Sequence, residues 1–183
     1  MGHDVEPARG RSTTSTRRWP SSRSGDCTSD QAVVRPGAKA LLTTDDGRVV
    51  MVRERRDDGS TFWTLPGGGL RPGESPVRGL HREVAEELQC DVELHGRVTR
   101  CTYRHVSRTD VVSVYDVFRG RLAGEPVPNR GEGIVEHRLV APPTVPPGTL
   151  PPFEDVVAEF ARSWPPADLI DGDGQGSRGW WVR

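Results

Sequence analysis

The stretch from Gly67 to Glu87 constrains the fold of this chain more than any other part of its sequence. Three consecutive glycines are followed by Glu74 and then by the acidic run Arg82-Glu83-Val84-Ala85-Glu86-Glu87. Glycine adopts positive φ angles readily and lets a ligand approach the backbone closely. The segment therefore predicts a glycine loop that leads into a short, strongly acidic helix.

The start and the buried side of this helix follow from its residue types. Ser75 is a suitable N-cap, and Pro76 suits the first helical position, where its missing N–H costs nothing. Apolar residues at helical spacing predict one buried stripe, formed by Val77, Leu80, Val84 and Leu88.

The acidic residues of the helix share a different flank. Glu83, Glu86 and Glu87 repel one another there, at a cost of about 0.2–0.5 kcal/mol per pair. Carboxylates are the ligands that Mg²⁺ prefers, and Mg²⁺ keeps waters that substrate phosphates can replace. The flank therefore predicts a divalent-cation site that faces a cleft.

The segment from Gly68 to Cys90 resembles the Nudix box, written G-x5-E-x7-R-E-U-x-E-E-x-G-U with U an apolar residue. The preceding Trp63-Thr64-Leu65-Pro66-Gly67 also resembles the usual lead-in of that family. One position departs, since Gln89 stands where the family has glycine. A non-glycine residue in the left-handed conformation costs about 1–2 kcal/mol, so the helix either accepts that cost or ends differently.

The resemblance implies an α/β fold, a Nudix-type α/β/α sandwich with a mixed β-sheet, over residues 31–164. It implies that Glu83, Glu86 and Glu87 bind Mg²⁺ (or Mn²⁺) and that the carbonyl of Gly67 adds a ligand. It also implies that Arg82 orients a catalytic glutamate and pairs with Glu74. The implied catalytic set is Arg82, Glu83, Glu86 and Glu87.

The implied reaction is attack of water on a diphosphate bond of a nucleoside diphosphate linked to another group. Many family members take a general base from a glutamate outside the box, and Glu132 and Glu136 are the candidates, although both suit an ordinary surface role. Arg53 and Arg55 share one face of a predicted strand and are candidates for phosphate contact, although a solvated edge fits equally well. Trp63 is a candidate for stacking on a base, although aromatic residues in strands more often belong to the core.

Elsewhere the pattern predicts alternating strands and one further helix. Two strands joined by Asp45-Asp46-Gly47 form a predicted hairpin, and a mixed sheet with helices on both sides fits the whole order. The predicted strands are 38–44, 48–56, 61–65, 92–103, 111–118 and 134–140. The predicted helix carries Phe153, Val156, Val157, Phe160 and Trp164.

The composition of the 183 residues narrows the class of protein. A net charge of −1 gives no electrostatic reason to expect a nucleic-acid polymer or an anionic membrane as a partner. No apolar run approaches the length of a transmembrane helix. Three cysteines without C-x-x-C spacing indicate neither disulfides nor zinc and favour a reducing, cytoplasmic setting. Residues 1–30 and 165–183 are predicted to be a disordered extension and a flexible tail.

Two other functions compete with hydrolysis. A Nudix-fold binding or regulatory module without catalysis usually has a broken carboxylate set, whereas this set is intact. The related isopentenyl-diphosphate isomerases need a cysteine that the box loop lacks. The sequence therefore favours a hydrolase of a small nucleotide, with a nucleoside triphosphate pyrophosphohydrolase preferred by elimination and a homodimer compatible with it.

Overall fold

The computed structural model describes residues 32–105, 110–142 and 144–163. The predictions for residues 1–30 and 165–183 lie outside this part of the chain. Within the described ranges, no helix is long and apolar enough to cross a membrane.

The strands of the described part form two three-stranded sheets. In the first, β5 lies between a parallel partner, β1, and an antiparallel partner, β4. In the second, β2 lies between β3 and β6, and both pairs are antiparallel. The strands are β1 Val33–Leu42, β2 Val49–Arg55, β3 Thr61–Thr64, β4 Val92–Arg104, β5 Val111–Leu122 and β6 Ile134–Val140. The first sheet is mixed, as predicted.

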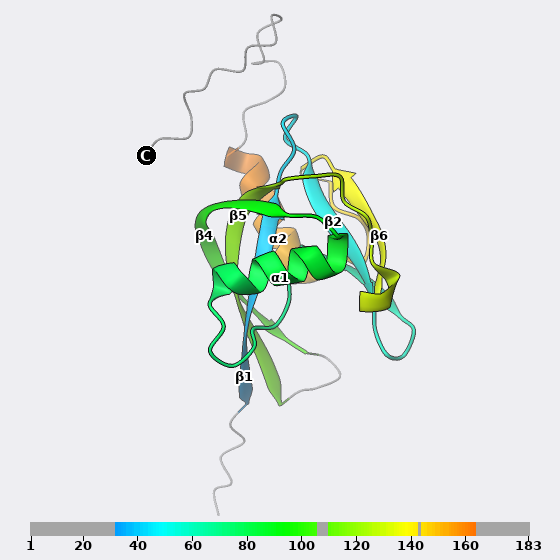
Figure 1. Cartoon of the computed structure of the whole chain (residues 1–183). Helices are drawn as coiled ribbons and strands as arrows, with labels where there is room; N and C mark the ends of the chain where they lie inside the picture. The colour runs from blue at the N-terminus through cyan, green and yellow to red at the C-terminus, as the bar shows by residue number, and fades with distance from the viewer. Residues whose placement is uncertain (1–31, 106–109, 143, 164–183) are drawn as a thin grey trace, which may run out of the picture. The chain divides into compact units, whose positions relative to one another are not determined.

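Two helices, α1 (Pro76–Leu88) and α2 (Pro151–Ser163), pack on opposite faces of the strands (Figure 1). Successive side chains of a strand point to opposite faces, and β1 shows this directly. Ala40 and Leu42 join a core cluster with residues of α1, whereas Leu41 joins a second cluster with residues of α2. The predicted arrangement of helices on both sides is confirmed.

The predicted hairpin at residues 45–47 forms only at its turn. The chain does turn there, since the N–H of Thr44 donates to the carbonyl of Arg48 at 2.9 Å and Gly47 has φ +79°. Apart from one isolated bridge between Thr43 and Val49, however, the two flanking strands pair with other strands. The pairing does not extend further because the backbone of β1 bonds to β5 and to the glycine loop, where the N–H of Ala40 donates to the carbonyl of Pro66 at 2.9 Å.

Helix α1 begins as predicted. The N–H of Arg78 donates to Ser75 Oγ at 3.4 Å, and Pro76 occupies the first helical position. Three members of the apolar stripe, Leu80, Val84 and Leu88, are fully buried, but Val77 is 43% exposed. In the first turn the buried position is taken by Gly79, which lies against Leu70 of the preceding loop.

Helix α1 is capped at its C-terminal end by Gln89, the residue that departs from the family pattern. This residue adopts the left-handed conformation, with φ 53° and ψ 32°, and its N–H donates to the carbonyl of Ala85 at 3.1 Å. Its side-chain amide donates to the carbonyl of Val127 at 3.4 Å. The helix therefore ends as a glycine would end it, and the chain accepts the cost of the left-handed conformation.

Candidate functional site

The first component of the site is the contact between the glycine loop and the last turn of α1. Gly67 has φ +113°, and a Cβ there would lie 2.4 Å from the carbonyl oxygen of Ala38. This close approach requires glycine. The N–H of Gly67 donates to Glu87 Oε2 at 2.9 Å, which draws a carboxylate into the interior between the loop and the helix.

Glu87 is 6% exposed, and burial raises the pKa of its carboxyl to about 8. The positive charge of Lys39 and the N–H of Gly67 act in the opposite direction and lower this pKa, whereas the charges of Glu54 and Glu83 raise it further. Desolvation disfavours the charged form of an acid, so it exceeds the partly compensating attraction. The charged carboxylate would gain from a further cation.

Arg82 organises the other carboxylates. Its Nε and Nη2 donate to the two oxygens of Glu74 at 2.9 and 2.8 Å. Its Nη1 donates to Glu83 Oε1 and to Glu86 Oε2, both at 2.8 Å. The bidentate bond from Arg82 is the main reason that the pKa of Glu74 is lowered to about 2, and the acidic neighbours raise the pKa of Arg82. One guanidinium therefore fixes three carboxylates, as Arg geometry allows.

The glycine loop leaves room for these side chains. A Cβ at Gly68 would lie 2.8 Å from the carboxyl carbon of Glu83. Glu86 also forms an ion pair with Arg71, with 3.1 Å between Oε1 and Nη2. The loop and the helix thus form one unit in which glycine and carboxylate positions depend on each other.

The donor chemistry of this unit fits a divalent cation. Glu83, Glu86 and Glu87 supply the hard oxygen ligands that Mg²⁺ and Mn²⁺ prefer. Within the described part of the chain, no three acidic, His or Cys side chains converge closely enough to form a metal centre as they stand. Arg82 Nη1 brings Glu83 and Glu86 together, whereas Glu87 bonds separately to the N–H of Gly67.

A family model, the NUDIX domain, matches residues 33–162. The chain belongs to the Nudix family. An RNA pyrophosphohydrolase of Saccharophagus degradans is 40% identical over 65 residues, which are 34% of this chain and 37% of that protein. The chain thus spans little more than a third of the length of the curated relatives that it matches.

Solved structures share the Nudix fold. The MutT protein of Methanosarcina mazei Go1 is 20% identical, with a TM-score of 0.62 over 71% of this chain and 94% of that chain. The MutT NUDIX hydrolase of Burkholderia pseudomallei is 21% identical, with a TM-score of 0.61 over 70% of this chain and 98% of that chain. These likenesses extend over the described fold and support its assignment.

The Nudix-box residues come together, but two predicted substrate contacts lie elsewhere. Trp63 belongs to the core cluster under α2, on the face of the strands opposite α1. Arg53 pairs with Trp63 across β2 and β3 and forms an ion pair with Glu136 at 3.0 Å. Arg55 is exposed at the end of β2. Arg53, Trp63 and Glu136 therefore form a cluster away from the carboxylates of α1.

Glu132 lies in a segment that is anchored to the Nudix helix. The N–H of Asn129 donates to the carbonyl of Glu87 at 2.8 Å, and its side-chain amide donates to the carbonyl of Glu86 at 2.9 Å. Asn129 then caps the short 3₁₀ turn Arg130–Glu132, where Glu132 is exposed. Of the two glutamates predicted outside the box, Glu132 is the one whose segment contacts α1.

Sequence reasoning missed two residues, Glu54 and Lys39. Glu54 continues the face of β2 that carries Val50 and Val52 toward α1, so strand alternation was an available signal. Lys39 interrupts the apolar run of β1 and is 4% exposed. Both side chains act on the charge of Glu87.

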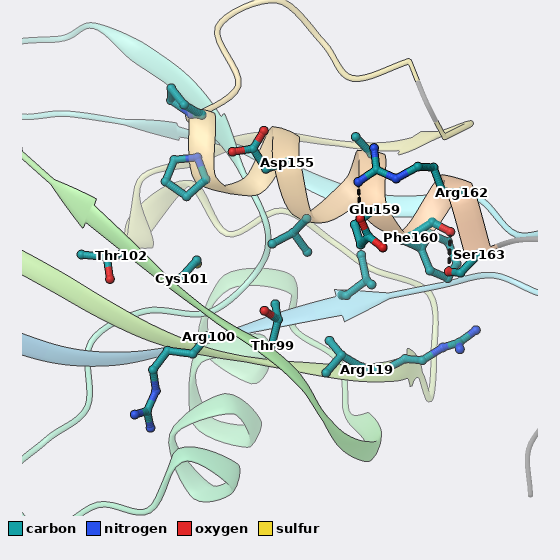
Figure 2. Close-up of a pocket in the computed structure, with 16 residues that line it drawn as sticks. Thr99, Arg100, Cys101, Thr102, Arg119, Asp155, Glu159, Phe160, Arg162 and Ser163 are labelled. Carbon is teal, nitrogen blue, oxygen red and sulfur yellow. Dashed lines mark hydrogen bonds and ion pairs between the residues drawn. The ribbon is translucent and has the colours of Figure 1, made fainter. Parts of the chain in front are cut away.

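A cavity of about 700 Å³ lies between β4 and α2 (Figure 2). Thr99 and Cys101 line its strand side, and Asp155 and Phe160 line its helix side. Arg119 stacks on Phe160 with 5.2 Å between its guanidinium carbon and the ring centroid. None of the Nudix-box residues lines this cavity, so its position does not alter the assignment of the carboxylate site.

Proposed function

We propose that this chain is a pyrophosphohydrolase that cleaves a diphosphate bond in a nucleoside diphosphate derivative. Mg²⁺ or Mn²⁺ would be held by Glu83, Glu86 and Glu87. One observation carries the proposal: Arg82 and the Gly67 N–H gather these three carboxylates beside a glycine loop, and one of them is buried. Membership of the Nudix family supports the same chemistry.

The residues of the site suit attack by water at phosphorus. A divalent cation, when bound, neutralises diphosphate charge and acidifies a water molecule. Arg82 holds Glu83 through its 2.8 Å ion pair, so this carboxylate has a fixed orientation from which to accept a proton. Glu132 is the second candidate for the base. The box contains no serine or cysteine paired with a base, which disfavours a covalent intermediate.

The substrate class is the finer part of the proposal. A nucleoside triphosphate is favoured, since the net charge of −1 provides no general attraction for a polymer. The second candidate is the 5′ end of an RNA, because curated relatives that match about a third of this chain are RNA pyrophosphohydrolases. A cytoplasmic location and a homodimer remain predictions of the sequence.

A substrate panel tests this proposal. Nucleoside triphosphates, dinucleotides, ADP-ribose, coenzyme A and a 5′-triphosphate RNA are incubated with Mg²⁺ or Mn²⁺, and the products are resolved by chromatography. We expect cleavage between two phosphates that stops when EDTA is added. Glu83→Gln and Glu87→Gln should each lower kcat about 100-fold or more, the effect of losing a major transition-state charge interaction.

Glu125→Gln is the matched control, because Glu125 is exposed and lies outside the box. It should retain wild-type turnover. No cleavage of any substrate would favour the catalytically silent module instead. Near wild-type kcat in both box variants would remove the metal-ligand assignment.

A further inference from the structure

Lys39 is the one lysine of the chain and lies in the interior. It sits on the α2 face of β1, in register with Val117 of β5. Its ammonium is 5.8 Å from the ring centroid of Tyr115 and 5.7 Å from that of Phe153, within the range of a cation–π contact. A buried ammonium needs such partners, because removal from water is costly for a charge.

The hydrogen-bond partner of this ammonium is the carbonyl oxygen of Gly67. The same glycine donates its N–H to Glu87 from the other direction. Gly67 therefore bonds to the Glu87 carboxylate of α1 through its N–H and to the Lys39 ammonium of β1 through its carbonyl. The Gly67 carbonyl is the backbone oxygen that the Nudix resemblance offers as a metal ligand, and here a cation of the chain itself already binds it.

We propose that Lys39 is a resident cation of this site, which keeps the Gly67 carbonyl from a divalent ion and weakens metal binding by the glutamates. The inference rests on the proposed function, in which those glutamates hold the ion. Lys39 acts through Gly67 and Glu87 and is therefore a positioning residue.

Two physical effects point in the same direction. An ammonium near the carboxylates repels a divalent cation, and this repulsion is strong where water is excluded. A carbonyl that accepts a bond from the ammonium is also a poorer ligand for a second cation. The consequence is a site that binds the free ion weakly and gains it together with the phosphate oxygens of the substrate, as is common for Mg²⁺.

Three substitutions separate the charge from the hydrogen bond. Lys39→Met removes both and keeps the length of the side chain. Lys39→Gln removes the charge but retains an amide that can donate to Gly67. Lys39→Arg retains the charge and the donors. Arg119→Met is the matched control, because Arg119 is a half-buried cation on the same face that lines the cavity under α2.

The measurement is binding of Mn²⁺ alone, followed by electron paramagnetic resonance on the full chain without substrate, with melting temperatures recorded to verify folding. We expect Lys39→Met to bind Mn²⁺ at least about tenfold more tightly than the wild type, given the size of charge repulsion at a desolvated site. Lys39→Gln should lie between them. Lys39→Arg and Arg119→Met should stay near the wild type.

The sign of the change makes the test decisive. Loss of a purely structural lysine would distort the site and weaken binding, whereas loss of a competing cation strengthens it. Unchanged or weaker Mn²⁺ binding in folded Lys39→Gln overturns the inference, even if Lys39→Met fails to fold.

Glu83→Gln distinguishes this failure from failure of the proposed function. If the wild type binds Mn²⁺ and Glu83→Gln does not, the metal site stands, and the Lys39 variants alone decide the inference. If neither the wild type nor Lys39→Met binds Mn²⁺, or if Glu83→Gln binds it as well as the wild type does, both the metal-site assignment and the role of Lys39 are overturned.

Discussion

At the scale of single residues, Glu87 is the group whose environment departs most from that of an ordinary surface acid. It combines deep burial with a single backbone hydrogen bond, and burial raises its pKa to about 8 from an ordinary value of 4.5. Between these two values the folded chain binds more protons at this position than the unfolded chain does. The contribution of the protonated Glu87 carboxyl to the free energy of unfolding is therefore fully present below pH 4.5 and is lost as pH rises through 8.

This predicts a pH-dependent stability that Glu87→Gln removes. Without metal, the wild-type melting temperature should fall relative to that of Glu87→Gln as pH rises from 5 to 8. The neutral variant should be the more stable of the two at pH 8. Melting curves recorded by circular dichroism in EDTA provide the measurement. Parallel pH profiles for the two proteins would show that the carboxyl of Glu87 is charged throughout this range.

The box residues could be assigned from sequence because their geometry is local. Glu83, Glu86 and Glu87 share a flank by helix periodicity, and Arg82 reaches back along the first turns of α1 to Glu74. Lys39 could not be assigned in this way. Its contact with Gly67 spans 28 residues and exists because the backbone of β1 bonds to the glycine loop, where the N–H of Ala38 donates to the carbonyl of Gly68 at 2.9 Å.

At the scale of secondary-structure elements, the end of α1 contains a correctable strain. Gln89 holds a left-handed conformation that glycine adopts without penalty. Gln89→Gly should therefore stabilise the protein by up to about 1 kcal/mol, less the weak side-chain bond to Val127 that is lost. The measurement is the urea midpoint, with turnover recorded on the same samples and expected to be unchanged.

Gln89→Ala is the control for that prediction. It removes the same bond to Val127 and retains the left-handed penalty, so it should be no more stable than the wild type. A lower stability for Gln89→Gly than for Gln89→Ala would show that the backbone penalty is not the quantity that matters there.

The strands show where element prediction succeeds and where it stops. The bounds of β6 and the antiparallel pairing of β4 with β5 follow from alternation and turn residues close in sequence. The assumed pairing of β1 with β2 does not extend beyond the Thr43–Val49 bridge, because β5 and the glycine loop bond to the backbone of β1 instead. The strands of Arg53 and Trp63 were predicted, but the sequence left open which face of the sheet they occupy, and the structure places Trp63 in the cluster under α2.

At the scale of the whole molecule, the family match covers residues 33–162 and leaves both ends of the chain outside it. The terminal segments contain too few apolar residues to build a core. A chain of residues 31–164 should therefore keep the turnover of the full chain and its melting temperature to within a few degrees. Thermal melts and kinetics on both proteins check this. A larger fall would indicate a contact from a terminal segment, with Trp180 and Trp181 as the first candidates to substitute.

The two hydrogen bonds of Gly67, to Glu87 and to Lys39, also have a spectroscopic consequence. Its N–H donates to a buried carboxylate, and its carbonyl accepts from an ammonium on the opposite face of the strands. Its hydrogen–deuterium exchange therefore depends on whether both sides are assembled. A single glycine resonance in an NMR spectrum can report the state of the site before any substrate is known.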